Sequence, residues 1–106
     1  KNTNNLNTKE YLMTLFLEEY NISTLSKEEV KSLLGTDIIE DDNIQYKYGD
    51  TNNDMLADKI LKIYYENEDY VKHEIITNTE FCWRNEHFKY DDSFDLHNCF
   101  YNRLDN

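Results

Sequence analysis

The segment SKEEVKSLLGTDIIEDDNIQYKY, residues 26–48, contains the clearest local folding signals in the chain. Its first third predicts a helix over 27–34, because Ser26 is a favoured N-cap and Glu29, three residues later, completes a capping box. Gly35 follows at the position where a glycine commonly ends a helix. The segment therefore predicts a short, well-capped helix that runs directly into a dense group of acids.

The hydrophobic period changes from helical to two at the end of this segment. Ile44, Tyr46 and Tyr48 alternate with Gln45 and Lys47, which is typical of a half-buried strand. The apolar pattern of residues 55–65 fits either a helix or a strand. Strands are also predicted over residues 71–77, 80–85 and 87–90.

A second amphipathic helix is predicted nearer the N-terminus, over residues 9–20, with Thr8 as its N-cap. Its apolar face should pack in the core and consists of Leu12, Leu15 and Phe16. Residues 1–7 are expected to form a flexible leader. Two helices followed by several strands predict a single α+β domain over 8–106, with both helices packed on one face of an antiparallel sheet of about five strands.

The charge balance of the chain limits its possible partners. Among 106 residues there are 22 acidic and 11 basic ones, a formal net charge of −11 at pH 7. Such a surface repels nucleic acid and anionic membranes and attracts basic proteins, although many acidic proteins are acidic only for solubility. The two cysteines are too few for a disulfide framework, so we expect a cytoplasmic protein with a basic protein partner.

Acids are densest just after the helix over 27–34. Lys47 is the only base between residues 37 and 54, and the acids there are expected to be solvated. Closely spaced carboxylates can also imitate DNA, whose axis carries one phosphate charge about every 1.7 Å. An imitation of DNA would also offer an apolar site, which Val30, Leu33 and Leu34 could supply if they do not all pack on the sheet. The acids proposed to stand in for phosphates are Asp37, Glu40, Asp41 and Asp42.

The C-terminal third contains the residues that could support an enzyme. A tetrahedral zinc site with two cysteines and two histidines is conceivable, although the spacing matches no standard zinc finger. A thiol nucleophile with a histidine base is a further alternative, but no local motif indicates an oxyanion hole. These residues are Cys82, His87, His97 and Cys99. We expect no metal or other cofactor and no enzymatic activity.

Four stretches line up in order with a known family. TKEYLMTLF (8–16), SKEEVKSLL (26–34), LADKILKIYY (56–65) and LHNCFYNRLD (96–105) resemble the staphylococcal type of uracil-DNA glycosylase inhibitor, a group of small acidic DNA mimics. EEVKSLLG (28–35) also resembles the second helix of the bacteriophage-encoded inhibitor of the same enzyme. The resemblance implies two helices with five strands, and it makes residues 59–66 a strand.

The resemblance implies a monomer that forms a 1:1 complex with uracil-DNA glycosylase. Members of the family occupy the DNA-binding cleft, with acids in place of phosphates and an apolar pocket around the leucine that the enzyme inserts into the minor groove. Carried over by position, Glu28 and Glu29 match an acidic pair at the start of the second helix. Val30, Leu33 and Leu34 match the residues that line the pocket.

The tail contributes further expected contacts, and one position departs from the family. In the staphylococcal type the later segment also faces the enzyme, which here implicates Tyr90, Asp91, Asp92, Phe94 and His97. Both relatives have a glutamate shortly before the second helix, where this chain has residues 21–25. Either Ser23 and its polar neighbours replace that glutamate, or the target is another DNA-binding protein, such as a restriction or CRISPR effector.

Overall fold

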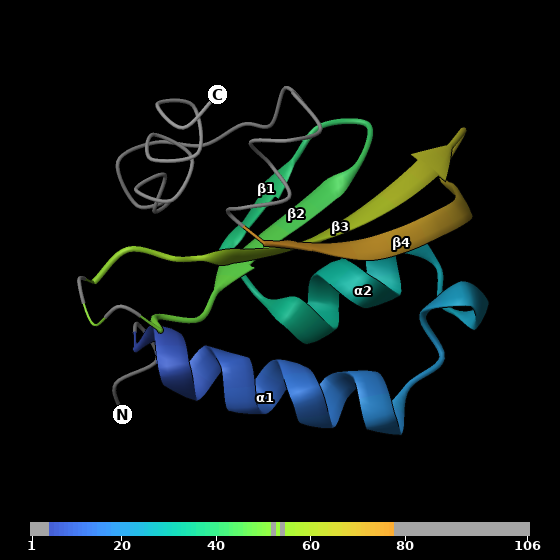
Figure 1. Ribbon diagram of the computed structural model, residues 1–106. Coiled ribbons are helices and arrows are strands. Elements are labelled where there is room, and N and C mark those ends of the chain that lie inside the picture. The colour runs from blue at the N-terminus through green and yellow to red at the C-terminus, as the bar shows by residue number, and fades with distance from the viewer. Residues whose placement is uncertain (1–4, 52, 54, 78–106) are drawn as a thin grey trace.

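The computed structural model describes residues 5–51, 53 and 55–77. Two α-helices and a short 3-10 helix precede four strands (Figure 1). In chain order these elements are α1 (Leu6–Glu19), η1 (Ile22–Thr24), α2 (Lys27–Leu34), β1 (Ile38–Glu40), β2 (Ile44–Tyr48), β3 (Lys59–Glu66) and β4 (Asp69–Thr77).

The four strands form one antiparallel sheet in the order β1-β2-β3-β4, and α1 and α2 both lie on the same face of it (Figure 1). The α+β class is therefore confirmed, with four strands among the described residues where about five were expected. The strands predicted over 44–48 and 59–66 are confirmed, and the one over 71–77 lies within β4. The strands predicted over 80–85 and 87–90 lie outside the described residues.

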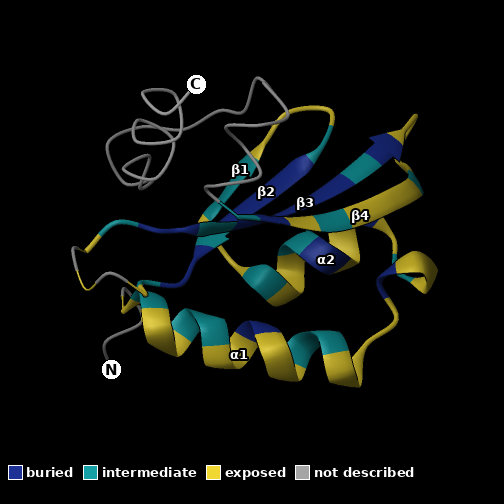
Figure 2. Ribbon diagram, viewed as in Figure 1, coloured by how far each residue is buried: buried dark blue, intermediate teal, exposed yellow. Residues whose placement is uncertain are grey.

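The main core lies between the sheet and the helices. Every second residue of β2 and of β3 is buried there against Met13, Ile22 and Val30 (Figure 2). These strand residues are Ile44, Tyr46, Tyr48, Leu61, Ile63 and Tyr65. The alternation predicted for β2 is thus the pattern of its contact with the helices, but the prediction of a half-buried strand was wrong for Gln45, which is only 3% exposed on the other face. The intervening Ile60 of β3 pairs with Ile76 of β4, and both are buried in a second, smaller cluster with Ala57.

Strand β1 was not predicted, because its sequence was interpreted as part of a solvated acidic segment. It is only three residues long and begins with two consecutive isoleucines, so it shows no alternation. Its conformation comes from pairing with β2, where Ile38 lies opposite Tyr46 and Glu40 opposite Ile44. A tight turn joins the two strands, and within it the Asn43 amide donates to Asp41 Oδ1 at 2.8 Å.

Helix α1 begins earlier than predicted. Its N-cap is Asn5, whose side chain accepts a hydrogen bond from the Thr8 amide at 2.9 Å, so the assignment of Thr8 as the cap was wrong. Leu6 and Asn7 belong to the helix and not to a leader, since the Gly49 amide donates to the Leu6 carbonyl at 3.0 Å. A buried tertiary contact thus extends the helix by one turn.

Helix α2 has the predicted bounds and the predicted caps. The Glu29 amide donates to Ser26 Oγ at 3.0 Å, and the Ser26 amide donates to Glu29 Oε1 at 2.8 Å. Gly35 ends the helix with a φ of 83°. In the described part of the chain, neither α-helix is long and apolar enough to cross a lipid bilayer.

Two glycines with nearly equal positive φ allow a matched test of packing. A methyl group at Gly49 (φ +84°) would lie 2.6 Å from Asp58 Oδ1, whereas one at Gly35 (φ +83°) would meet no atom within 4 Å. Backbone strain of this kind costs about 1–3 kcal/mol. We expect Gly35→Ala to lower the free energy of unfolding by that amount and Gly49→Ala to lower it further, as measured by urea denaturation. Equal losses would contradict the predicted clash.

Candidate functional site

The side chain of Lys27 lies beneath the acidic segment that follows α2. It is 4% exposed, and its Nζ donates to the carbonyl oxygens of Asp41 at 2.8 Å and Asp42 at 3.2 Å. The same Nζ lies 3.5 Å from a carboxylate oxygen of Glu40 and 3.9 Å from one of Glu68. The expectation that the acids of this segment are simply solvated was therefore wrong for Glu40, because a lysine of the preceding helix reaches its carboxylate.

Lys31, one helical turn after Lys27, pairs with two carboxylates at the surface. Its Nζ lies 3.2 Å from Glu28 and 3.2 Å from Glu40. These hydrogen bonds, first to Glu40 and then to Glu28, raise the pKa of Lys31. The hydrogen bond from Lys31 lowers the pKa of Glu40 below its ordinary value of 4.5. Glu40 is therefore held as a carboxylate between two lysines and is not freely solvated.

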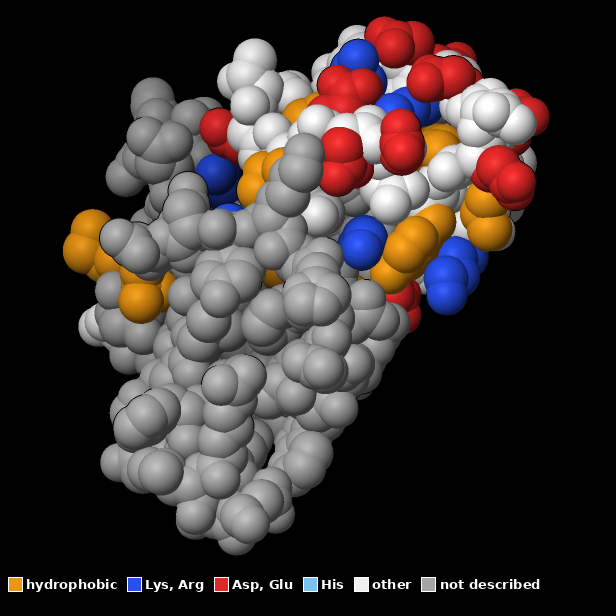
Figure 3. Space-filling view, turned by 90° about the horizontal axis from the view of Figure 1, so that it is seen from above, with side chains coloured by type: hydrophobic (Ala, Val, Ile, Leu, Met, Phe, Trp, Pro, Cys, Tyr) orange, Lys and Arg blue, Asp and Glu red, His pale blue; other side chains and the backbone are white. Residues whose placement is uncertain are grey.

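The acidic surface continues from the β1–β2 turn to the β3–β4 turn. Asp42, Glu66 and Glu68 line an open cavity of 530 Å³ together with Tyr65 and Asn67. Figure 3 shows acidic side chains gathered over the described part of this face, with lysines and apolar groups between them. Three carboxylates (Glu28, Glu40 and Glu68) lie within 4 Å of Lys27 or Lys31, and acids outnumber bases two to one in the whole chain. Such a surface favours contact with a basic partner.

An apolar groove lies between α1 and α2. It has a volume of 220 Å³ and is lined mainly by Leu12, Phe16, Leu33 and Leu34. Lys9 and Asp37 also line it and form an ion pair at 3.2 Å. Leu12 is 50% exposed and Leu33 is 44% exposed, so both present apolar surface to solvent. The expectation that the apolar face of α1 packs in the core was wrong for Leu12 and also for Leu15, which is 43% exposed.

The α2 residues that were predicted to contact a partner lie in different environments. Leu33 and Leu34 do line an apolar groove, but Val30 is completely buried in the core and cannot contact a partner directly. Glu29 is engaged in the capping box. Glu28 stays exposed and pairs with Lys31.

The polar residues before α2, which were expected to contact a partner, form hydrogen bonds with one another. The Ser23 hydroxyl donates to Asn21 Oδ1 at 2.6 Å, and the Ser23 amide donates to the same atom at 3.1 Å. Both bonds cap η1, and Ser23 remains exposed at the surface. The predicted contacts of the tail lie outside the described residues: Tyr90, Asp91, Asp92, Phe94 and His97. The same applies to Cys82, His87 and Cys99 of the alternative zinc or thiol site.

Sequence reasoning missed several residues of these surfaces. Leu12 and Phe16 of the groove were assigned to the core, and their spacing of four residues identified the face of α1 but not its exposure. Lys27 was recognised only as part of a helix. No sequence pattern indicated that Glu66 and Glu68 belong to the acidic surface. Only the folding of the sheet brings the β3–β4 turn beside the β1–β2 turn.

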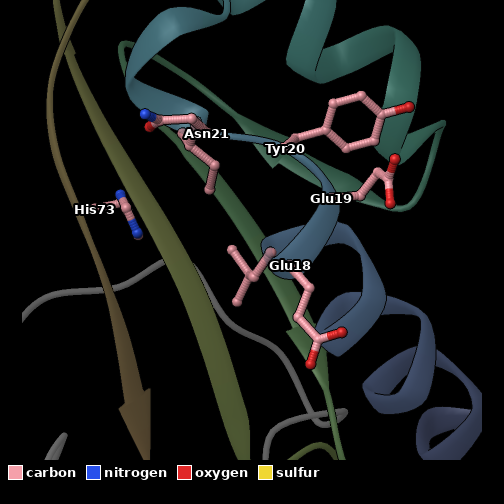
Figure 4. Close-up of a pocket in the computed structure, with 7 residues that line it drawn as sticks. Glu18, Glu19, Tyr20, Asn21 and His73 are labelled. Carbon is pink, nitrogen blue, oxygen red and sulfur yellow. The ribbon is translucent and has the colours of Figure 1, made fainter.

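A further pocket of 460 Å³ lies where α1 ends, opposite β4 (Figure 4). His73 enters it from β4, and the His73 Nδ1 lies 2.7 Å from the Tyr70 hydroxyl. The carboxylates of Glu18 and Glu19 point in different directions and do not converge on the imidazole (Figure 4). Among the described residues, no three histidine, cysteine or acidic side chains are grouped so that they could hold a metal ion.

Acidic pH should weaken the ion pair between Lys31 of α2 and Glu40 of β1. A carboxyl whose pKa is lowered on folding contributes stability above its unfolded value, and this contribution is lost as the pH falls through the folded value. We therefore expect Glu40→Gln to reduce stability at pH 7 and to reduce it progressively less below pH 4.5. Urea denaturation across this pH range measures the difference.

The partner of Glu40 provides the control. In a Lys31→Met background the effect of Glu40→Gln should be smaller, since the hydrogen bond that contributes most to the shift is already absent. Identical pH profiles for the wild type and Glu40→Gln would contradict this assignment.

Comparison of the chain with models of protein families, with curated proteins and with solved structures finds no match.

Proposed function

We propose that the protein is a non-enzymatic inhibitor of uracil-DNA glycosylase that binds the enzyme's DNA-binding cleft as a monomer in a 1:1 complex. The observation that carries the proposal is the arrangement of two surfaces on either side of α2. The apolar groove at Leu33 and Leu34 lies on one side, and the carboxylates around Lys27 and Lys31 lie on the other. This combination suits a basic cleft that inserts an apolar side chain.

The two surfaces contribute differently to such a complex. The carboxylates repel DNA and attract the basic cleft, so they govern the rate and orientation of approach. The groove offers leucine surface that is already partly exposed, and covering it with an aliphatic side chain removes apolar area from water. Apolar contact of this kind usually governs the lifetime of a complex.

The direct test is a uracil-excision assay in which the protein is titrated against a fixed concentration of uracil-DNA glycosylase. We expect excision to fall to background at a 1:1 molar ratio, because the protein and uracil-containing DNA would compete for one cleft. Undiminished excision at molar excess would refute the proposed target.

A pair of matched variants tests the groove. Leu33→Asp places a charge in the groove, whereas Val71→Asp places the same charge on β4 at a site that is 52% exposed. Both variants change the net charge equally. We expect Leu33→Asp to raise the concentration needed for half inhibition at least about tenfold, consistent with the loss of a buried apolar contact, and Val71→Asp to leave it nearly unchanged. Equal effects would exclude the groove as the contact.

One observation favours a second candidate function, which is inhibition of a different DNA-binding protein by imitation of DNA. The segment before α2 has no glutamate, and Ser23 in that segment is bound to Asn21. A different basic cleft, such as that of a restriction or CRISPR effector, would not require the missing carboxylate. Loss of DNA binding by such an effector, together with unaffected uracil excision, would establish this alternative.

A further inference from the structure

Lys27 joins three elements that are otherwise separate in the chain. It extends from the first turn of α2 and binds two carbonyl oxygens of the β1–β2 turn at 2.8 and 3.2 Å. Its Nζ also lies 3.9 Å from Glu68 in the β3–β4 turn and 5.6 Å from the centre of the Tyr65 ring. One buried ammonium group thus contacts both turns that carry the acidic surface.

The geometry distinguishes Lys27 from its neighbour Lys31. Both lysines lie on the same side of α2 and both pair with Glu40. Lys31 is more exposed, and its described ion pairs involve side chains alone. Lys27 binds backbone carbonyls, which cannot move without the turn to which they belong. A bond to the backbone restrains the β1–β2 turn directly, and the hydrogen bond from the Tyr65 amide to Asn43 Oδ1 at 3.0 Å joins that turn to the end of β3, next to the β3–β4 turn.

We infer that Lys27 is a positioning residue, which holds the β1–β2 and β3–β4 turns at one spacing so that Asp42, Glu66 and Glu68 face a basic partner as a preorganised array. The inference rests on the proposed function, since it concerns the same acidic surface. A preorganised array avoids the entropy loss of ordering two loops on binding, and it therefore prolongs the complex. The positive charge of Lys27 serves binding although the partner is itself basic.

Hydrogen exchange of the free protein tests the inference without any partner. We expect Lys27→Met to accelerate exchange at least about tenfold at the amides of residues 41–43 and 66–69, since the charge-assisted hydrogen bonds to the first turn and the ion pair with Glu68 in the second are lost. Lys31→Met is the matched control, because it changes the net charge by the same amount, from −11 to −12, and should leave these amides protected. Equal exchange in the two variants would overturn the inference.

A second measurement remains decisive if Lys27→Met does not fold. In the wild type, the two turns should exchange together with the amides of α2, as one cooperative unit, because one side chain links them. Independent and rapid exchange of the turns would overturn the inference. Lys27→Arg keeps the charge and should restore part of the protection in the turns.

Binding kinetics with uracil-DNA glycosylase complete the test. We expect Lys27→Met to increase the dissociation rate about tenfold, and Lys72→Met, which removes the same charge from an exposed site on β4, to change it little. Gly49→Ala controls for lost stability, because it strains a site away from both turns and should leave the dissociation rate unchanged. An unchanged rate in Lys27→Met would overturn the role in binding. If the wild type does not bind the enzyme, the proposed target fails, while the exchange data still decide whether Lys27 positions the turns.

Discussion

The contacts of the buried Lys27 ammonium group fix α2 relative to the two acidic turns. A buried charge is unfavourable unless its hydrogen-bonding capacity is satisfied. Here two carbonyl oxygens, two carboxylates and an aromatic ring surround it. Removing any one of these groups would leave the cation less compensated, so the helix and both turns are constrained to keep their relative positions. Part of the acidic surface therefore belongs to the folded framework, through the pairing of Glu40 and Glu68 with Lys27.

Helix α2 separates two chemically different surfaces because of its period. Residues four apart lie on the same side of a helix, so Lys27 and Lys31 both face the acidic turns. Val30 is buried in the core, whereas Leu33 and Leu34 in the last turn reach the groove beside α1. The eight residues of the helix thus place an apolar groove next to a group of carboxylates. The proposed competition with DNA uses both surfaces at once.

The elements that could be predicted are those with complete local signals. The capping box of α2 joins residues three apart, and the alternation of β2 repeats every two residues, so both patterns are visible in a short window. Strand β1 has only three residues and depends on its partner, while the first turn of α1 depends on the contact between Leu6 and Gly49. Residues Leu33 and Leu34 of the groove were predicted, whereas Leu12 and Phe16 were not, since amphipathicity does not reveal how completely a helix face is covered.

Composition and short-range patterns were enough to predict the α+β class, the bounds of α2, the strand over 44–48 and the acidic character of the surface, whereas the pattern of residues 55–65 alone fitted either a helix or a strand. The burial of Val30, the open groove between the helices and the position of Lys27 beneath the acids became visible in the folded chain alone. The physical reason is distance along the chain. The bonds from Lys27 to Asp41 and Asp42 span 14 and 15 residues, so no short-range pattern reveals them.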